Sequence, residues 1–301
     1  MLEVMASPAR AALPVQPKRM RRMAWACLLL LLLVICLSAF LRHRAEGLGC
    51  QPWPSCFAAG KAASGAPESL ARAAHRVAAT SVLLLVIGML TLALRARPIL
   101  RREAGLSAWL LLLALLLAWL GVHTAGSRLP LVALGNLLGG FLLLATAGRL
   151  LAPSARRGLG GFAMAVGMLL ALQIGGGALV SASHAGLACE DLRGCADRAG
   201  AAGWPWPALQ PWAVARLPPG DAALLQLLHR AGAGFAALAV AALGVLALRQ
   251  GRRGEGLAVL VLLTALLMLG LVVGSTGLPL GLVLLHSLGS ALLLALVVRL
   301  V

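Results

Sequence analysis

Eight apolar stretches of 18 or more residues run along this chain of 301 residues. A helix of about 20 such residues spans the ~30 Å hydrocarbon core of a bilayer. The stretches are continuously rich in Leu, Ala and Val and do not alternate apolar with polar residues, which disfavours spanning strands. We predict an all-α membrane protein with eight transmembrane helices, at residues 24–41, 74–96, 106–125, 130–150, 160–182, 222–248, 255–274 and 278–301.

The basic residues lie mainly at the ends of the predicted helices. Only 12% of the residues are charged, about half the fraction of a soluble domain, yet the net charge is +17. The side that carries both termini has 16 Lys and Arg residues, and the opposite side has 8 in two much longer loops. The positive-inside rule therefore predicts that both termini, including a tail at residues 1–23, are cytoplasmic. This distribution explains the net charge without a nucleic-acid partner.

A four-helix unit occurs twice in the chain. The stretch LPLVALGNLLGGFLLLA at 129–145 matches LPLGLVLLHSLGSALLLA at 278–295. An even number of helices in each unit gives both copies the same orientation in the membrane. We therefore predict two tandem four-helix bundles, at residues 24–150 and 151–301, related by a pseudo-two-fold axis along the membrane normal.

Two predicted loops on the side opposite the termini each contain a C-x5-C pair. They read GLGCQPWPSC at 47–56 and AGLACEDLRGC at 185–195. An oxidising compartment on that side permits disulfides, and of the three possible pairings closure within each loop is the simplest. A zinc site is the competing interpretation, although C-x5-C is an unusual zinc spacing. We predict two disulfides, structural or redox-active, between Cys50 and Cys56 and between Cys189 and Cys195.

Histidines within the predicted spanning helices are the candidates for chemistry, because an ionisable residue inside a membrane is costly. His229 and His286 lie in helices that run in the same direction, so their imidazoles can reach a similar depth. Two neutral imidazoles on opposite axial faces of an iron hold a heme between helices. Interhelical hydrogen bonding is the alternative. Weaker candidates are His43, in a loop among arginines, and His123 and His184, which have no counterpart in the other unit.

The first unit differs from the second at one of these positions. His75 corresponds to His229, each followed by an Arg, whereas Asn136 falls opposite His286. A carboxamide is a poor iron ligand, so the first bundle offers at most one strong axial bond. Such a site suits a heme that binds transiently as a substrate. Equally, it suits a degenerate unit that binds no ligand well.

Together these features resemble the heme A synthase family, membrane enzymes that serve cytochrome oxidase assembly. The resemblance covers nearly the whole chain after residue 23 and includes the motif QIGGGALVSASHAGLAC at 173–189. It implies a heme b cofactor held in the C-terminal bundle by His229 and His286. It also implies that the N-terminal bundle binds heme O at His75 and oxidises its C8 methyl group to a formyl group, which gives heme A.

The same resemblance implies the setting in which the protein works. Cys50 and Cys56 would form their disulfide near the substrate. The protein would be a multi-pass component of the inner membrane of a bacterial cell, in contact with lipid. Its expected partners are heme O synthase and cytochrome c oxidase subunits. Whether the protein forms a homo-oligomer is left open.

Two departures from the family pattern fall in the first unit. Asn136 replaces a family histidine, and Arg72 stands where a carboxylate is common, with Glu68 the nearest acid. Three functions therefore stay open. The first is an active heme A synthase, and the second is a heme-binding assembly factor without catalysis. The third is a membrane b-type cytochrome that moves electrons, for example from quinol.

Overall fold

The computed structural model describes residues 18–45, 66–123, 129–152, 159–189, 192–200, 210–212 and 217–301. Eight helices in these ranges are long and apolar enough to cross a membrane, and the same ranges contain no strand. The prediction of an all-α protein with eight spans is confirmed. The spanning helices are α1 (Lys18–Ala45), α3 (Ala66–Arg95), α4 (Arg101–His123), α5 (Pro130–Leu150), α6 (Gly160–Ala182), α8 (Pro219–Arg249), α9 (Arg253–Ser275) and α10 (Leu280–Leu300).

Proline and glycine define several of the helix ends. Pro130 and Pro219 are the first residues of α5 and α8, where a missing backbone N–H leaves no helical hydrogen bond unmade. The turn from α8 to α9 contains Gly251 with a φ of +76°, a conformation that side chains disfavour. The N–H of Arg252 then donates to the carbonyl of Ala247 at 2.9 Å and closes the end of α8. These signals mark where the spans begin and end, and the turn from α8 to α9 has only a few residues.

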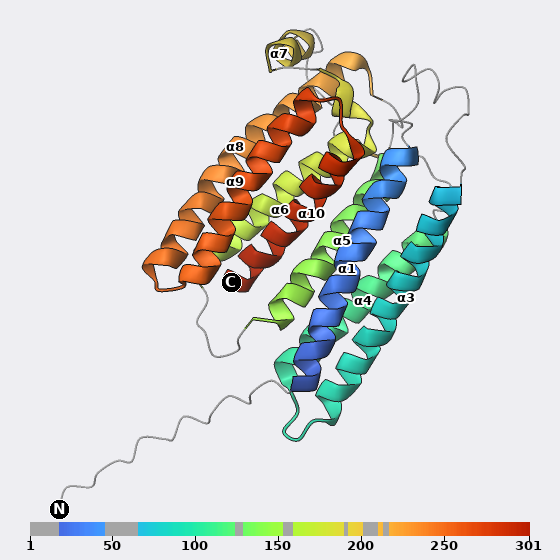
Figure 1. Cartoon of the computed structure of the whole chain (residues 1–301), viewed down its shortest axis with the longest axis vertical. Coiled ribbons are helices and arrows are strands. Elements are labelled where there is room, and N and C mark those ends of the chain that lie inside the picture. Colours follow the sequence, from blue (N-terminus) through green and yellow to red (C-terminus); the bar gives the residue numbers. More distant parts are fainter. Residues whose placement is uncertain are drawn as a thin grey trace, which may run out of the picture.

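Successive spanning helices run in opposite directions, so the molecule has two distinct ends (Figure 1). At one end α1 and α6 finish and α3 and α8 begin; we call it the cysteine end, because Cys189 and Cys195 lie there. At the opposite end, which we call the basic end, many arginines lie at helix termini, among them Arg102, Arg149, Arg252 and Arg299.

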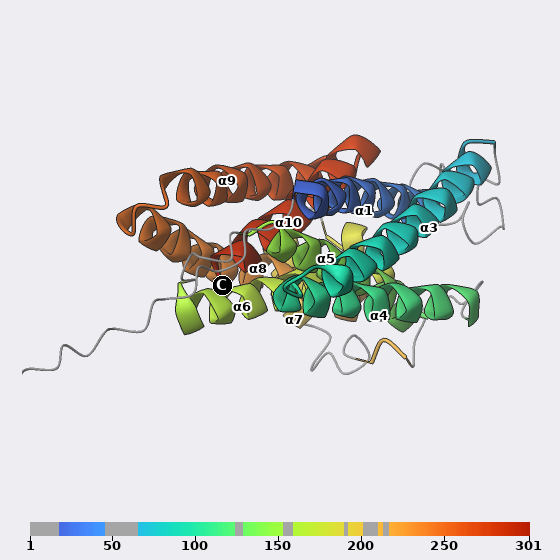
Figure 2. The same cartoon turned by 90° about the horizontal axis from the view of Figure 1, so that it is seen from below.

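The spanning helices contact one another in two rings of four. In the first ring α1, α3, α4 and α5 contact in that order and α5 returns to α1. In the second ring α6, α8, α9 and α10 do the same. The rings meet where α10 packs on α5 and α1 and where α5 packs on α6, between α3 and α4 on one side and α8 and α9 on the other (Figures 1 and 2). The pairing agrees with a two-fold arrangement, and the axis itself stays a prediction.

Equivalent helix contacts hold the third and fourth helices together in both rings. A Cβ added at Gly139 on α5 would lie 2.5 Å from Cδ2 of Leu117 on α4. A Cβ added at Gly289 on α10 would lie 2.8 Å from Cδ2 of Leu266 on α9. Small residues let membrane helices approach closely. The two glycines that align in the sequence therefore do the same work in both units.

A matching pair of hydrogen bonds closes the basic end. Arg102 donates from Nη2 to the carbonyl oxygen of Arg149 at 2.6 Å. Arg252 donates from Nη2 to the carbonyl oxygen of Arg299 at 3.4 Å. In each ring, a guanidinium group at the start of the third helix thus satisfies an orphan carbonyl at the end of the fourth.

The outward-facing surface of the helices is apolar. Leu172, Leu238 and Phe235 have exposed fractions of 74%, 73% and 71%. In water, a surface covered with such side chains would be an interaction site or an aggregation hazard. In a bilayer the same surface faces lipid, while the helices satisfy their own backbone hydrogen bonds.

Two helix starts differ most from the predicted ones, and one short helix was not predicted. Helix α1 begins at Lys18, inside the predicted tail at 1–23, and α3 begins at Ala66 rather than at residue 74. Both helices extend beyond their apolar stretches with polar turns, which the apolar criterion does not detect. The short helix α7 (Leu192–Gly200), which packs on α8 at the cysteine end, was not predicted.

Candidate functional site

A cavity of about 1000 Å³ lies within the second ring, bounded by α6, α8, α9 and α10. Residues of α1 and α5 from the first ring also line it. Its volume is at the upper end of the ~300–1,000 Å³ range of small-molecule and cofactor sites. Most of the lining is aliphatic, so a large apolar ligand suits this space.

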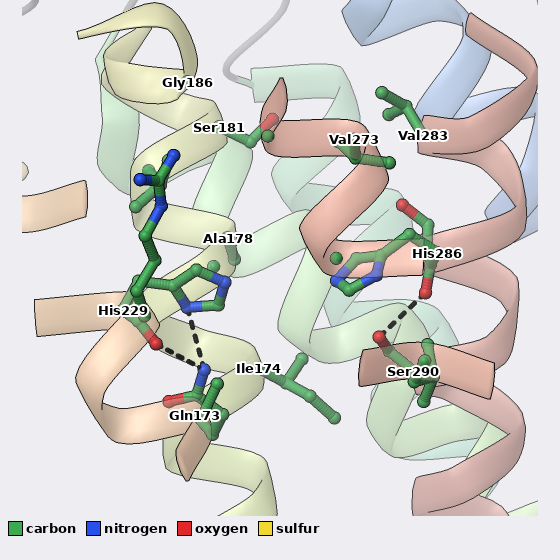
Figure 3. A pocket seen from close by; sticks show the side chains of 18 of the residues that line it. Gln173, Ile174, Ala178, Ser181, Gly186, His229, Val273, Val283, His286 and Ser290 are labelled. Atoms are coloured by element: carbon green, nitrogen blue, oxygen red, sulfur yellow. Dashed lines mark hydrogen bonds between the residues drawn. The ribbon is translucent and has the colours of Figure 1, made fainter. Parts of the chain in front are cut away.

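His229 and His286 line this cavity from opposite sides (Figure 3). His229 projects from α8 toward α6, and His286 projects from α10. The Nδ1 atom of His286 is buried and has no hydrogen-bond partner, while Ser290 donates to the backbone carbonyl of His286 at 2.8 Å. The structure therefore brings together the two histidines that the sequence singled out in the second unit.

Glycines make room for both imidazole rings. A Cβ at Gly177 on α6 would lie 2.7 Å from Cε1 of His229, and a Cβ at Gly270 on α9 would lie 3.4 Å from Cε1 of His286. Any larger residue at 177 would displace the ring of His229. The GGG of the motif at 173–189 thus has a local explanation, because it lets α6 approach the imidazole.

Gln173, which lies on α6 as Gly177 does, fixes the orientation of His229 on α8. Its amide nitrogen lies 3.0 Å from Nδ1 of His229 and donates to the backbone carbonyl of His229 at 2.9 Å. Sequence reasoning missed Gln173, because glutamine is neither ionisable nor a usual metal ligand. Its spacing could have identified it, since Gln173 lies one helical turn before Gly177 in the motif at 173–189.

The fit of this cavity to a heme can be tested on its donor atoms. Two imidazoles alone are too few to hold a bare metal ion. The part of the chain that the structure describes contains no group of three or more His, Cys, Asp or Glu that could do so. A heme brings its own four nitrogen ligands and needs only the two axial positions filled. The facing imidazoles and the mostly aliphatic lining fit that group.

The first ring presents a different picture around His75. His75 on α3 and Asn136 on α5 are both half-buried, and neither lines the cavity described above. Arg72, one turn before His75, is exposed. Glu68 is buried and accepts a hydrogen bond from Nε of Arg44 at 2.7 Å. The nearest acid to His75 is thus engaged in an ion pair with α1.

One predicted disulfide is present at the cysteine end. Cys189 and Cys195 are bonded, with their Cα atoms 5.2 Å apart, and both side chains are buried. Arg230 on α8 lies against this bridge, with Nη1 at 3.8 Å from Sγ of Cys195. The predicted Cys50–Cys56 pair lies outside the described residues.

The structure corrects the prediction for His43. The sequence placed it in a loop, but it lies in α1 with an exposed fraction of 7%. Its Nε2 donates to the carbonyl of Leu278 at 2.9 Å, in the turn between α9 and α10. His43, Arg42 and His184 all line the cavity. The remaining weak candidate, His123, is exposed near the end of α4, where its ring stacks on Trp119.

The fold and the cavity define a polytopic helical membrane protein in which one four-helix ring encloses two facing histidines. A family model described as cytochrome oxidase assembly protein (COX15-CtaA) matches residues 67–298. The chain therefore belongs to this family, the heme A synthase family, as its sequence features indicated. A search of curated proteins found no match.

Proposed function

We propose that the protein is a heme A synthase that holds a resident heme b between His229 and His286. The facing arrangement of these two imidazoles in one cavity carries the proposal. Membership of the cytochrome oxidase assembly family gives the broader role, since heme A is made for that oxidase. A bound heme b would supply one-electron redox chemistry at this site.

The residues around the proposed cofactor have separate tasks. His229 and His286 would provide the two axial nitrogens, and Gln173 would orient the first of them. The aliphatic lining would exclude water and keep the surroundings of the iron at low dielectric. Gly177 and Gly270 would leave space for the imidazole rings beside α6 and α9.

The first ring is proposed to bind heme O as substrate at His75. Asn136 lies where the second ring has His286, so only one strong axial bond is available there. A substrate must be held less tightly than a resident cofactor if the product is to leave. The reaction would oxidise the C8 methyl group to a formyl group and release heme A.

The proposed setting is the inner membrane of a bacterial cell, with both chain termini in the cytoplasm. Eight apolar helices and the excess of basic residues at the end that carries the termini support it. Heme O synthase, as the source of substrate, and subunits of cytochrome c oxidase, as the acceptor of product, are the proposed partners.

Co-expression with a heme O synthase, in a host that lacks heme A, tests the proposed reaction. Hemes extracted from the membranes should include heme A with the wild-type protein and not with the His75→Ala variant. Recovery of heme O and heme b only, from a wild-type protein that is present and heme-loaded, would contradict the assignment.

A heme-binding assembly factor without catalysis is the second candidate. The specific observations in its favour are Asn136 and the exposed Arg72, both in the ring where substrate would bind. The purified protein would then contain heme b alone, and the extraction above would yield no heme A.

A further inference from the structure

The cavity in the second ring has a mostly aliphatic lining, and its arginines lie at the cysteine end. Arg42 and His43 of α1 and Arg230 of α8 line it at the cysteine end. Phe141, on α5, is among the apolar residues of its lining. Among the described residues that line the cavity there is no Asp or Glu. This arrangement fits a ligand with a large apolar body and negative charge at one edge.

Two of these basic residues come from the first ring. Arg42 and His43 lie near the end of α1, which otherwise packs with α3 and α5 and reaches the second ring through α10. The hydrogen bond from Nε2 of His43 to the carbonyl of Leu278 ties the end of α1 to the turn that precedes α10. The cavity of one ring is therefore completed by a helix of the other.

His43 supplies an independent indication of a ligand. With Nε2 committed to Leu278, its second ring nitrogen, Nδ1, is buried and has no hydrogen-bond partner. The residue has an exposed fraction of only 7%, so water does not readily serve this atom. Buried polar atoms in proteins nearly always have a partner. A carboxylate oxygen at Nδ1 would provide one, with both ring nitrogens then donating.

Arg230 on α8 is held by close contact with α9. A Cβ at Gly274 on α9 would lie 3.2 Å from its Nη2, so glycine at 274 leaves space for the guanidinium group. Guanidinium groups bind carboxylates through short, charge-assisted hydrogen bonds. Arg42 and Arg230 thus place two positive charges on the wall of a mostly aliphatic space whose lining contains no Asp or Glu among the described residues.

We propose that Arg42 and His43 of α1, together with Arg230, bind the carboxylate groups of the ligand that occupies the second ring. The inference rests on the proposed function, in which that ligand is heme b and the carboxylates are its two propionates. The first ring then contributes to cofactor retention without contacting the iron.

The test compares heme b with its dimethyl ester, in which both carboxylates are neutral. Full-length protein from a heme-deficient culture is titrated with each compound, and the low-spin absorbance gives the affinity. The wild type should bind heme b more tightly than the ester by about tenfold or more, the effect of losing a charge-assisted hydrogen bond. Arg42→Gln and His43→Gln should each weaken heme b binding by about tenfold and change ester binding by less than about twofold.

Arg249→Gln is the matched control, because it removes one positive charge from α8 at the basic end, where Arg249 is exposed. It should bind both compounds as the wild type does. Ester binding also reports on folding, so a variant that lost both compounds would show a structural role and overturn the proposal. Equal affinities for heme b and ester, with a bis-imidazole spectrum for each, would overturn this inference and leave the proposed cofactor site intact. A wild-type protein that gives no low-spin spectrum would overturn both this inference and the proposed cofactor site.

Discussion

The amide nitrogen of Gln173 lies 3.0 Å from Nδ1 of His229 and 2.9 Å from the backbone carbonyl oxygen of the same residue. An amide group has two N–H donors, and in this arrangement both go to His229. With the nitrogen of the amide toward the ring, Nδ1 is the acceptor, and a neutral ring then carries its proton on Nε2. An imidazole that ligates iron through Nε2 needs the opposite tautomer, with Nδ1 donating. Heme binding should therefore require the amide of Gln173 to turn its oxygen toward the ring.

Substitutions of Gln173 should change the midpoint potential and the affinity of the proposed heme. Gln173→Glu offers Nδ1 an anionic acceptor, which makes the imidazole a stronger donor to iron and should lower the heme midpoint potential. Gln173→Leu removes the acceptor and should reduce heme affinity by about 10- to 100-fold. Redox titration and heme content measure the two effects.

The matched control for Gln173 is Gln226. It lines the same cavity, is buried, and donates to the carbonyl of Gly186 at 2.7 Å rather than to an imidazole. Gln226→Leu should leave the potential unchanged. If both glutamine variants shift the potential equally, Gln173 has no special relation to the ring of His229.

The two rings should respond differently to loss of a histidine. His229→Ala or His286→Ala should leave at most one strong axial bond, so the low-spin b-type spectrum should disappear and heme should be lost on purification. His75→Ala should preserve that spectrum while abolishing heme A formation. Loss of the resident spectrum in His75→Ala, together with its survival in His286→Ala, would reverse the assignment of cofactor and substrate to the two rings.

Gly177 should be intolerant of even one added methyl group. The Cβ of Gly177→Ala would stand 2.7 Å from Cε1 of His229, so the ring or α6 must shift, at a cost of about 1–3 kcal/mol. We expect about tenfold lower heme occupancy, measured as heme per protein. Gly161→Ala, on the same helix, places its Cβ where nothing lies within 4 Å and should behave as the wild type.

The cysteines at the cysteine end should be protected as a pair. Without reductant, Cys189 and Cys195 should resist thiol labelling, and after reduction both should react. Closing so short a loop should contribute about 2 kcal/mol to stability, so the reduced protein should unfold at a lower temperature. Cys50 and Cys56 are predicted to show the same labelling. Full labelling of Cys189 and Cys195 before reduction would contradict the disulfide between them.

The orientation of the helices is open to a direct measurement. Reporter fusions after Arg102 and Arg157 should be active in the cytoplasm, and fusions near Gly60 and Gly203 should be active outside it, because basic residues are retained inside. An inverted pattern would place the disulfide in a reducing compartment.

Length and apolarity sufficed to predict the spanning helices, because each span must meet the same physical requirement of crossing hydrocarbon. The pairing of His229 with His286 also followed from helix direction and depth. Helix α7 was not predicted, because its nine residues contain no apolar stretch. The position of Arg42 and His43 at the cavity was not predicted. Packing between the rings, which no periodicity within α1 encodes, brings them there.

The equivalent glycine contacts of Gly139 and Gly289, and the equivalent arginine caps at the basic end, bear on how a duplicated gene can diverge. These glycine contacts and arginine caps involve none of the histidines. One copy can therefore exchange an imidazole for an amide, as at Asn136, and still assemble the same helices. In this architecture the residues that hold the scaffold are separate from those that could hold a ligand, so that one half can change its ligand set while the other keeps both histidines.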